Sequence, residues 1–173
     1  MPNRTDALVA VYEAAFAASD GADEGRLVGT LARGLLTRVE QADLRVQATW
    51  DGDVATGCII WTRLRFIAEG PVVYLLSPVA VAPGHQGQGL GQELIRRGLD
   101  ALRGEGVAMA VTYGSPDYYG RVGFRPVAPS DVAPPHPLSQ PEGWLARSLD
   151  ATAPTSLRGA SRCVGPLDDP AYW

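Results

Sequence analysis

The stretch Val81-Ala-Pro-Gly-His-Gln86-Gly-Gln-Gly-Leu-Gly91 decides the fold of this chain. It leads from an apolar segment through alternating glycines into a segment with helical spacing. Because Gly87, Gly89 and Gly91 have no Cβ, their backbone N–H groups stay open to a ligand. The first turn of a helix adds its own unpaired N–H groups and the positive end of its dipole. We therefore expect an anion-binding cradle that suits a phosphate or pyrophosphate.

The segments on either side of this loop predict a βαβ unit. Residues 72–81 are apolar almost throughout, as in a strand that is covered on both faces. A helix follows, with its inward face at Leu90, Leu94, Ile95, Leu99 and Leu102. Residues 107–113 read as a second buried strand. Because a helix connects the two strands, we expect them to be parallel.

The N-terminal part predicts two helices and a hairpin. Apolar residues recur at helical spacing from Leu8 to Phe16, after Thr5-Asp6 as a cap. A second helix is expected over about residues 23–37, and its inward face is Leu27, Leu31 and Leu35. Strands over 44–50 and 54–66 follow, joined by a turn at Asp51-Gly52.

After the βαβ unit the pattern becomes irregular. Ser115 is expected to cap a helix with Pro116 in its first turn, and Gly120 keeps that helix short. Six prolines between residues 126 and 141 indicate a long surface loop or a substrate lid. Residues 144–149 are expected to return as a strand.

Length and composition limit the classes of protein. A chain of 173 residues with 46% hydrophobic and 20% charged residues is expected to form one globular domain, residues 1–173. No apolar run approaches the roughly 18 residues that span a bilayer, and the N-terminus lacks a signal-peptide pattern. Cys58 and Cys163 cannot form a disulfide framework, and buried free thiols in the cytoplasm are the simplest interpretation, with a redox role as the alternative.

Charge excludes two kinds of site. All 15 basic residues are arginine, which rules out a lysine-dependent phosphate loop. The net charge is −4 and no basic stripe is present, so nucleic acid is not an expected partner.

Two motifs at this spacing resemble the GNAT family of N-acetyltransferases. The family's acetyl-CoA loop, Q/R-x-x-G-x-G/A after a strand, matches Gln86-Gly-Gln-Gly89-Leu-Gly91. Its second landmark, Y-x-x-x-G-F after the next strand, matches Tyr119 to Phe124. The dinucleotide fingerprint G-x-G-x-x-G does not fit the glycine spacing. The resemblance covers about residues 43–127, and the proline-rich extension over about 126–173 looks most like the YhbS-like branch of predicted acetyltransferases.

The resemblance implies a fold and an activity. The fold would be a single α/β (α+β) acyl-CoA N-acyltransferase domain, with a mixed, mostly antiparallel sheet, a splayed parallel central pair and helices on both faces. The activity would be transfer of an acetyl group from acetyl-CoA to a primary amine by direct attack in a ternary complex, without a metal. A small-molecule or peptide acceptor and a possible homodimer follow from the same resemblance. The alternatives are a non-catalytic acyl-CoA-binding or regulatory module and a nucleotide-phosphate binder unrelated to CoA.

The resemblance also assigns site residues. By this resemblance, acetyl-CoA would be bound by Val79, Ala80, Val81, Gln86, Gly87, Gln88, Gly89, Leu90 and Gly91. The backbone of Val79 and Val81 would pair with the pantetheine arm, and Pro78 marks either the splay or a simple bulge. Tyr119 would be the general acid that protonates the CoA thiolate, its alternative being a core tyrosine. Tyr118 is expected to pack.

No general base is evident. Many family members place a glutamate on the central strand, but residues 74–77 hold no carboxylate. Assistance from a water chain or from one of four side chains stays open: Glu69, His85, Asp117 and Ser77. His85 and His136 are more simply solvated surface residues, and Trp50 and Trp61 are expected in the core or as groove walls. The family's usual first strand has no counterpart before Leu8, so either that strand is absent or the natural start lies upstream.

Overall fold

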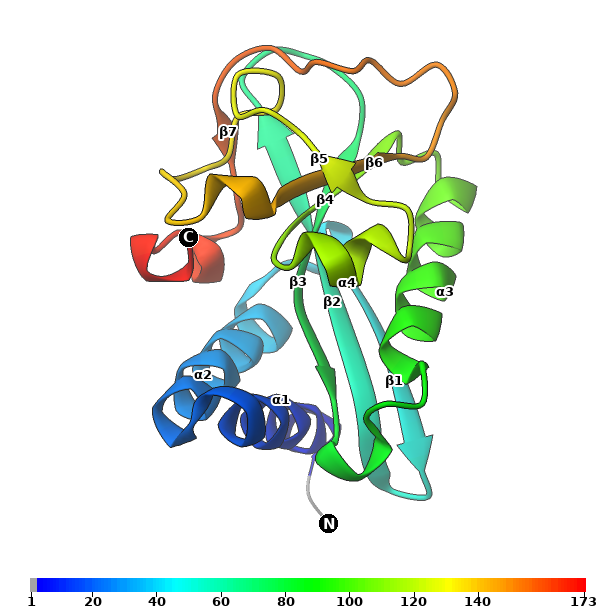
Figure 1. The fold of residues 1–173 in the computed structure, drawn as a ribbon, viewed down its shortest axis with the longest axis vertical. Helices are drawn as coiled ribbons and strands as arrows, with labels where there is room; N and C mark the ends of the chain where they lie inside the picture. Colours follow the sequence, from blue (N-terminus) through cyan, green and yellow to red (C-terminus); the bar gives the residue numbers. More distant parts are fainter. Residues whose placement is uncertain (1–2) are drawn as a thin grey trace.

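The computed structural model describes residues 3–173, which fold around a seven-stranded sheet with helices on both faces (Figure 1). The strands are β1 (Leu44–Asp51), β2 (Val54–Phe66), β3 (Val73–Val81), β4 (Met109–Tyr113), β5 (Arg125–Pro126), β6 (Trp144–Ser148) and β7 (Ser161–Arg162). The helices are α1 (Arg4–Asp20), α2 (Ala22–Arg38), α3 (Leu90–Gly104) and α4 (Pro116–Gly120). Within the described part of the chain, α1 is the first element, and no helix has the length and apolar character to cross a membrane.

The strand order is β1-β2-β3-β4-β6-β5, and the short β7 pairs with the end of β2. Every pairing is antiparallel except that of β3 with β4. The expected mixed, mostly antiparallel sheet with a parallel central pair is therefore confirmed. The predicted helix and strand pattern on either side of the glycine loop is also confirmed, although β4 begins at Met109 and not at residue 107.

The two central strands separate half-way along β3. Their parallel register runs from Val73 opposite Met109 to Leu76 opposite Thr112 and then stops, while β3 continues to Val81. The separation coincides with a bulge, because β3 has two residues between Leu76 and Val79 where β2 has only one. Ser77 and Pro78 are these two residues, so the bulge and the splay occur together at Pro78.

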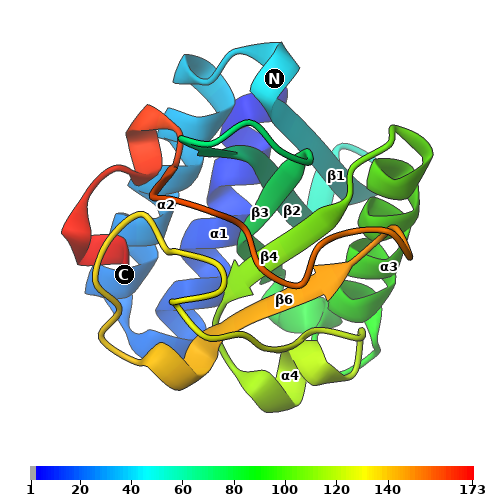
Figure 2. The same cartoon turned by 90° about the horizontal axis from the view of Figure 1, so that it is seen from above.

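Two apolar cores lie on the two faces of the sheet. Helices α1 and α2 cover one face, and α3 with α4 covers the other (Figure 2). The first core contains Tyr12 and Leu35, and the second contains Trp61 and Ile95, all without exposed surface. Helix α3 approaches β2 closely because Gly98 has no side chain to collide with the Trp61 ring. Trp61 is thus a core residue, whereas Trp50 is half-buried beneath the Arg4 guanidinium.

Two details of the N-terminal helices were predicted wrongly. Asn3, and not Thr5-Asp6, caps α1, because its side chain accepts a hydrogen bond from the Thr5 N–H. In α2 the buried positions include Val28, Leu31 and Leu35, while Leu27 is 36% exposed. The buried face of α2 is therefore rotated by one position from the expected face. The reason is that glycines contact α1, since a Cβ at Gly25 or Gly29 would collide with that helix.

The C-terminal part of the chain completes the sheet on the far side of β4. The predicted cap at Ser115 and the strand from Trp144 are confirmed, while the two-residue strands β5 and β7 were not predicted. The proline-rich segment is tied to the end of β4, because the Tyr113 hydroxyl accepts from the Gln140 N–H at 2.7 Å. Trp173 packs beside Tyr113 with 6.2 Å between ring centroids.

Candidate functional site

A cleft of about 410 Å³ opens where β3 leaves β4. Its walls come from the end of β3, the glycine loop, the start of α3 and the helix α4. The lining residues are Val79, Val81, His85, Gln86, Gly87, Gly89, Leu90, Gly91, Gln92, Tyr118, Tyr119 and Arg121. The structure thus brings most of the residues from the two sequence motifs to one place.

One wall of the cleft is an unpaired strand edge. In an antiparallel ladder, successive residues point their backbone groups alternately toward and away from the partner strand. The Ala82 N–H donates to the Thr56 carbonyl of β2 at 2.9 Å, which fixes that alternation along the end of β3. The N–H and C=O groups of Val79 and Val81 therefore point away from β2, into the gap that β4 has left, where the Val81 C=O accepts a hydrogen bond from the Gln86 side chain. An extended chain with amide groups fits this edge as an additional strand would.

The same alternation means that Ala80, which was expected to bind acetyl-CoA, does not face the cleft. Its backbone groups point toward Cys58 of β2, and its side chain is buried in the core on the α1 side. Gln88 is exposed and does not line the cleft either. Gln86 does line it, but its side-chain amide donates to the Val81 carbonyl at 2.9 Å. In this arrangement Gln86 holds the loop against the strand end.

The floor of the cleft is a cradle of free N–H groups. Gly87 and Gly89 have φ of +73° and +78°, a conformation that side-chain-bearing residues rarely adopt. No heavy atom lies within 4 Å of a Cβ built at either glycine, so both face open space. Gly89 is the N-cap of α3 and offers no side chain to the first turn, which leaves the N–H groups of that turn without a partner in the helix. These N–H groups and the helix dipole favour a diphosphate at this position.

The two adjacent tyrosines contact each other, with 5.0 Å between ring centroids, but pack against different walls of the cleft. A Cβ at Gly91 would collide with the Tyr118 hydroxyl, so this hydroxyl lies against the first turn of α3 beside the cradle. The Tyr119 ring instead lies against Gly114 at the end of β4, where a Cβ would come within 2.7 Å of its Cε2. Tyr118 was expected only to pack, but the structure makes it part of the cleft wall.

Tyr119 lies next to the point where the central strands part. Burial raises the pKa of Tyr119 to about 12, and the neighbouring Thr112 hydroxyl opposes part of this rise. Thr112 is the last residue of β4 that pairs with β3, and its hydroxyl donates to the Leu76 carbonyl at 3.0 Å. With this pKa, the Tyr119 phenol keeps its proton at neutral pH.

Arg121 is a cleft residue to which the sequence motifs give no role. It lines the cleft and also an adjoining cavity of about 330 Å³, whose other basic residues are Arg96 and Arg147. Three guanidinium groups there face one carboxylate, that of Asp100. This excess of positive charge beside the cradle favours a further anionic group on the ligand.

No carboxylate lines the cleft among the residues that the structure describes. Of the four side chains considered as a general base, Glu69 lines a separate cavity at the far end of β2, and Asp117 is exposed in α4. His85 lines the cleft at its cradle end and has a buried Nδ1 without a hydrogen-bond partner, so it is less solvated than expected. Ser77 lies directly after the last paired residue of β3, next to the splay.

The cysteines and His136 lie outside this cleft. Cys58 is a buried free thiol, as expected, and burial raises its pKa to about 11. Cys163 is also free but only half-buried, and burial together with Asp168 raises its pKa to about 11. His136 was expected on the surface, but its side chain is only 20% exposed and lies 2.7 Å from an Asp168 oxygen.

Comparison with known proteins supports the two sequence motifs. The acetyltransferase (GNAT) domain family matches residues 3–127, which is most of the chain. The chain belongs to the GNAT acetyltransferase family. The uncharacterized N-acetyltransferase YjhQ of Escherichia coli K12 is 39% identical to it over 129 residues, which are 71% of this chain and 70% of YjhQ. YhbS of the same organism is 42% identical over 89 residues, about half of each chain (51% and 53%).

Solved structures of the family share the fold. YhbS from Escherichia coli in complex with CoA has a TM-score of 0.79 at 23% identity, over 98% of this chain and 89% of YhbS. A GNAT acetyltransferase from Brucella melitensis in complex with acetyl-CoA has a TM-score of 0.69 at 26% identity, over 97% and 94% of the two chains. The expected family, its YhbS-like branch and the expected fold are confirmed.

Proposed function

We propose that this protein transfers an acetyl group from acetyl-CoA to a primary amine. The proposal rests on one observation: a free strand edge and an anion-binding cradle follow one another within the same cleft. The unpaired edge of β3 at Val79 and Val81 leads directly into the open cradle at Gly87 and Gly89. An extended amide chain that ends in a diphosphate has this shape and this sequence of polar groups, and the pantetheine diphosphate of CoA is such a chain.

Each part of the cleft has a role in this proposal. The backbone groups of Val79 and the N–H of Val81 hold the pantetheine amides. The N–H groups from Gly87 to Gly91 hold the diphosphate, with Leu90 in the first turn of α3. Gln86 keeps the loop in place through Val81. Arg121, together with Arg96 in the adjoining cavity, is placed to attract the 3′-phosphate. The fit favours CoA over a dinucleotide, because the strand edge requires an extended amide chain.

The chemistry needs a proton donor at the splay. Acetyl-CoA supplies an acetyl thioester, and the amine nitrogen of the acceptor bonds to its carbonyl carbon as the carbon–sulfur bond breaks. Tyr119 donates its phenolic proton to the departing sulfur. After the carbon–nitrogen bond forms, the nitrogen loses one proton to water, and the Tyr119 phenolate takes up a proton from solvent. The amine attacks the thioester directly, so no covalent enzyme intermediate forms.

Deprotonation of the amine falls to water in this proposal. An alkylamine with a pKa near 10.4 is mostly protonated at neutral pH and must lose a proton before it attacks. The cleft wall holds no carboxylate among residues 3–173. We propose that water ordered near the Ser77 hydroxyl removes the proton. The acceptor, a small molecule or a peptide, reaches the splay to form a ternary complex.

We further propose that the protein is a single domain with a cytoplasmic location, and a homodimer is the oligomeric state to test.

Thermal stabilisation by nucleotides tests ligand identity. We expect CoA and acetyl-CoA to raise the melting temperature more than NAD or ATP at equal concentration, because ligands that bind only the native state stabilise it by mass action. All four carry phosphates for the cradle, but only the first two carry pantetheine for the strand edge. Equal stabilisation by NAD in a fluorimetric melt would contradict the assignment.

A non-catalytic acyl-CoA-binding module would bind CoA in the same cleft. Release of free thiol from acetyl-CoA in the presence of an amine distinguishes the enzyme from such a module.

Replacing Arg121 tests the role of positive charge. Arg121→Gln is expected to weaken CoA binding about fivefold, since an exposed charge pair contributes roughly 1 kcal/mol. The loss should shrink as salt is added, because salt screens exposed charges. Isothermal titration at two ionic strengths measures both effects. The matched control is Arg97→Gln, because Arg97 is an exposed arginine of α3 outside both cavities. Equal losses in the two variants would remove Arg121 from the site.

A further inference from the structure

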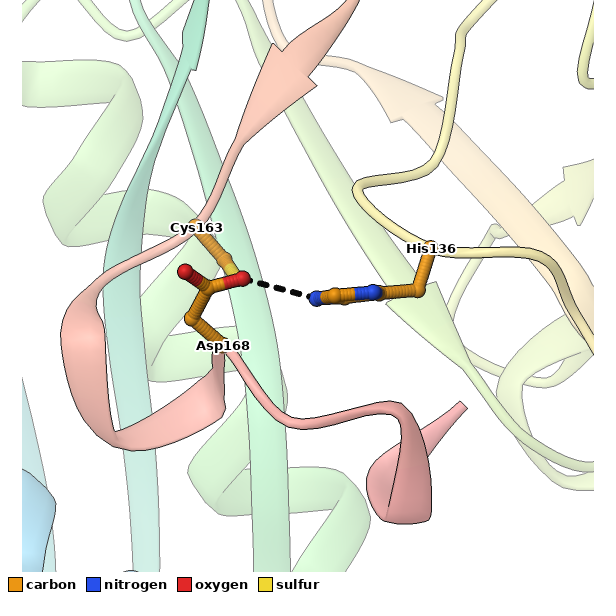
Figure 3. A group of neighbouring side chains, drawn as sticks. All are labelled: His136, Cys163 and Asp168. Atoms are coloured by element: carbon orange, nitrogen blue, oxygen red, sulfur yellow. Dashed lines mark hydrogen bonds and ion pairs between the residues drawn. The ribbon is translucent and has the colours of Figure 1, made fainter.

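Three side chains with different donor atoms meet far from the cleft motifs in sequence (Figure 3). His136 belongs to the proline-rich segment, Cys163 follows β7, and Asp168 follows the next 3₁₀ turn. The His136 Nε2 lies 2.7 Å from the Asp168 Oδ1, and one donor atom from each of the three residues lies within 4.8 Å of the other two. No residue of the group lines the cleft described above.

The backbone around this group is fixed on both sides. The Ser161 hydroxyl donates to the Ala133 carbonyl at 2.6 Å, which joins β7 to the segment that carries His136. On the other side, the Trp173 indole donates to the Leu167 carbonyl at 2.9 Å and its ring lies 6.2 Å from the His136 ring. The segments that carry the three donors are therefore held in place by two hydrogen bonds in which the donor side chains take no part.

The orientation of His136 argues against a cysteine–histidine–aspartate catalytic group. In such a group the histidine contacts the nucleophile with one ring nitrogen and the carboxylate with the other. Here the sulfur of Cys163 and the carboxylate of Asp168 both lie at the Nε2 end of the ring, as Figure 3 shows. Three donor atoms that converge on one point are the arrangement of a cation site.

We propose that His136, Cys163 and Asp168 bind a Zn²⁺ ion. Imidazole nitrogen, thiolate sulfur and carboxylate oxygen are the donors that zinc accepts, whereas calcium and magnesium require oxygen donors. In a tetrahedral site these donors lie roughly 3.3–3.6 Å apart, given the usual zinc–ligand distances. The present separations run from 2.7 Å to at most 4.8 Å, and the Asp168 side chain can move to bring the donors into this range because it is 66% exposed.

The site has a route for the ion and a balanced charge. A cavity of about 380 Å³ reaches Cys163 and Asp168 from solvent, with Pro135, Ser161 and Arg162 as its other walls. On binding, the Cys163 thiol releases its proton to solvent, and thiolate and carboxylate then neutralise the two charges of zinc. Three protein ligands leave the fourth position to water. Bound zinc would clamp the proline-rich segment to the C-terminal segment.

Cobalt substitution tests the site directly. Co²⁺ added to tag-free, chelator-treated protein is expected to give a sulfur-to-cobalt charge-transfer band with ligand-field bands of tetrahedral intensity, and one equivalent of Zn²⁺ should remove both. Cys163→Ser should abolish the charge-transfer band, while the control Cys58→Ser, which changes the other cysteine, should keep it. The absence of the band from the wild-type protein, or its survival in Cys163→Ser, would overturn the proposal.

Two further variants make the test independent of folding in any one of them. His136→Gln and Asp168→Asn are each expected to weaken Zn²⁺ binding at least tenfold in a competition titration with a chromophoric chelator. Because Asp168 is exposed, its variant should fold as the wild type does. Zinc should also raise the melting temperature by the same amount with and without saturating CoA, since the two sites are separate. Unchanged zinc affinity in both variants would show that the three residues are not ligands.

Discussion

Gly89→Leu is expected to abolish measurable CoA binding. The Gly89 φ of +78° points a side chain into the open cradle, where no protein atom lies within 4 Å and where we place the diphosphate. A leucine there would stand between the phosphates and the N–H groups of the first turn of α3. Each hydrogen bond to a charged group contributes roughly 1.5–3 kcal/mol, so the loss of two weakens binding about 100-fold or more. Isothermal titration with CoA measures the loss.

The control for this variant lies at the other end of the same helix. Gly106 follows α3 with a φ of +81° and also has open space around its Cβ position. Gly106→Leu therefore carries the same backbone strain, roughly 1–2 kcal/mol, without touching the cleft. Both variants should lose similar thermal stability, but only Gly89→Leu should lose CoA affinity. Wild-type affinity in folded Gly89→Leu would refute the cradle.

The sequence predicted those parts of the fold that neighbouring residues determine. The glycine loop, its flanking strand and its helix lie within one continuous segment, and their periodicities are enough to predict a parallel pair. The splay was expected from the family resemblance, with Pro78 marking either the splay or a simple bulge, and the structure adds its register. The caps and helix faces were less reliable, because the buried face of α2 depends on how closely Gly25 and Gly29 approach α1.

The cleft walls depend on directions that a motif does not specify. Ala80 belongs to the same strand as Val79 and Val81, but the pleat of the ladder points its backbone groups the other way. Tyr118 and Tyr119 are adjacent in sequence and their rings touch, yet Tyr118 packs against Gly91 of α3 and Tyr119 against Gly114 at the end of β4. Arg121 lies in the cleft only because α4 packs beside the cradle.

The group of His136, Cys163 and Asp168 could not be predicted from sequence. The residues are separated by 27 and 5 positions and lie in segments without periodicity, so no spacing rule joins them. They meet because β7 adds to the end of β2 and because Trp173 packs beside His136. The proline-rich segment, which sequence analysis treats as a surface loop or lid, contributes one of the three side chains.

Tyr119→Phe is expected to lower kcat by about 100-fold or more, while the affinity for acetyl-CoA stays nearly unchanged. General-acid assistance typically contributes 10²–10⁴-fold, and the lower part of this range applies because a thiolate is already a tolerable leaving group. The substitution removes one oxygen and keeps the ring that packs against Gly114 and Phe124. Steady-state kinetics with any accepted amine, together with CoA titration, separates the two quantities.

Tyr118→Phe is the matched control, and the structure gives it a different expected outcome. Its hydroxyl lies beside the cradle at Gly91 and not at the splay, so its loss should act on the KM for acetyl-CoA and leave kcat within a few-fold of the wild type. A kcat loss in Tyr118→Phe with none in Tyr119→Phe would show that Tyr119 is not the acid and would assign that role to Tyr118. If neither variant lowers kcat, solvent supplies the proton and the protein acts by positioning the reactants. The split between kcat and KM in two adjacent tyrosines therefore locates the reacting sulfur along the cleft.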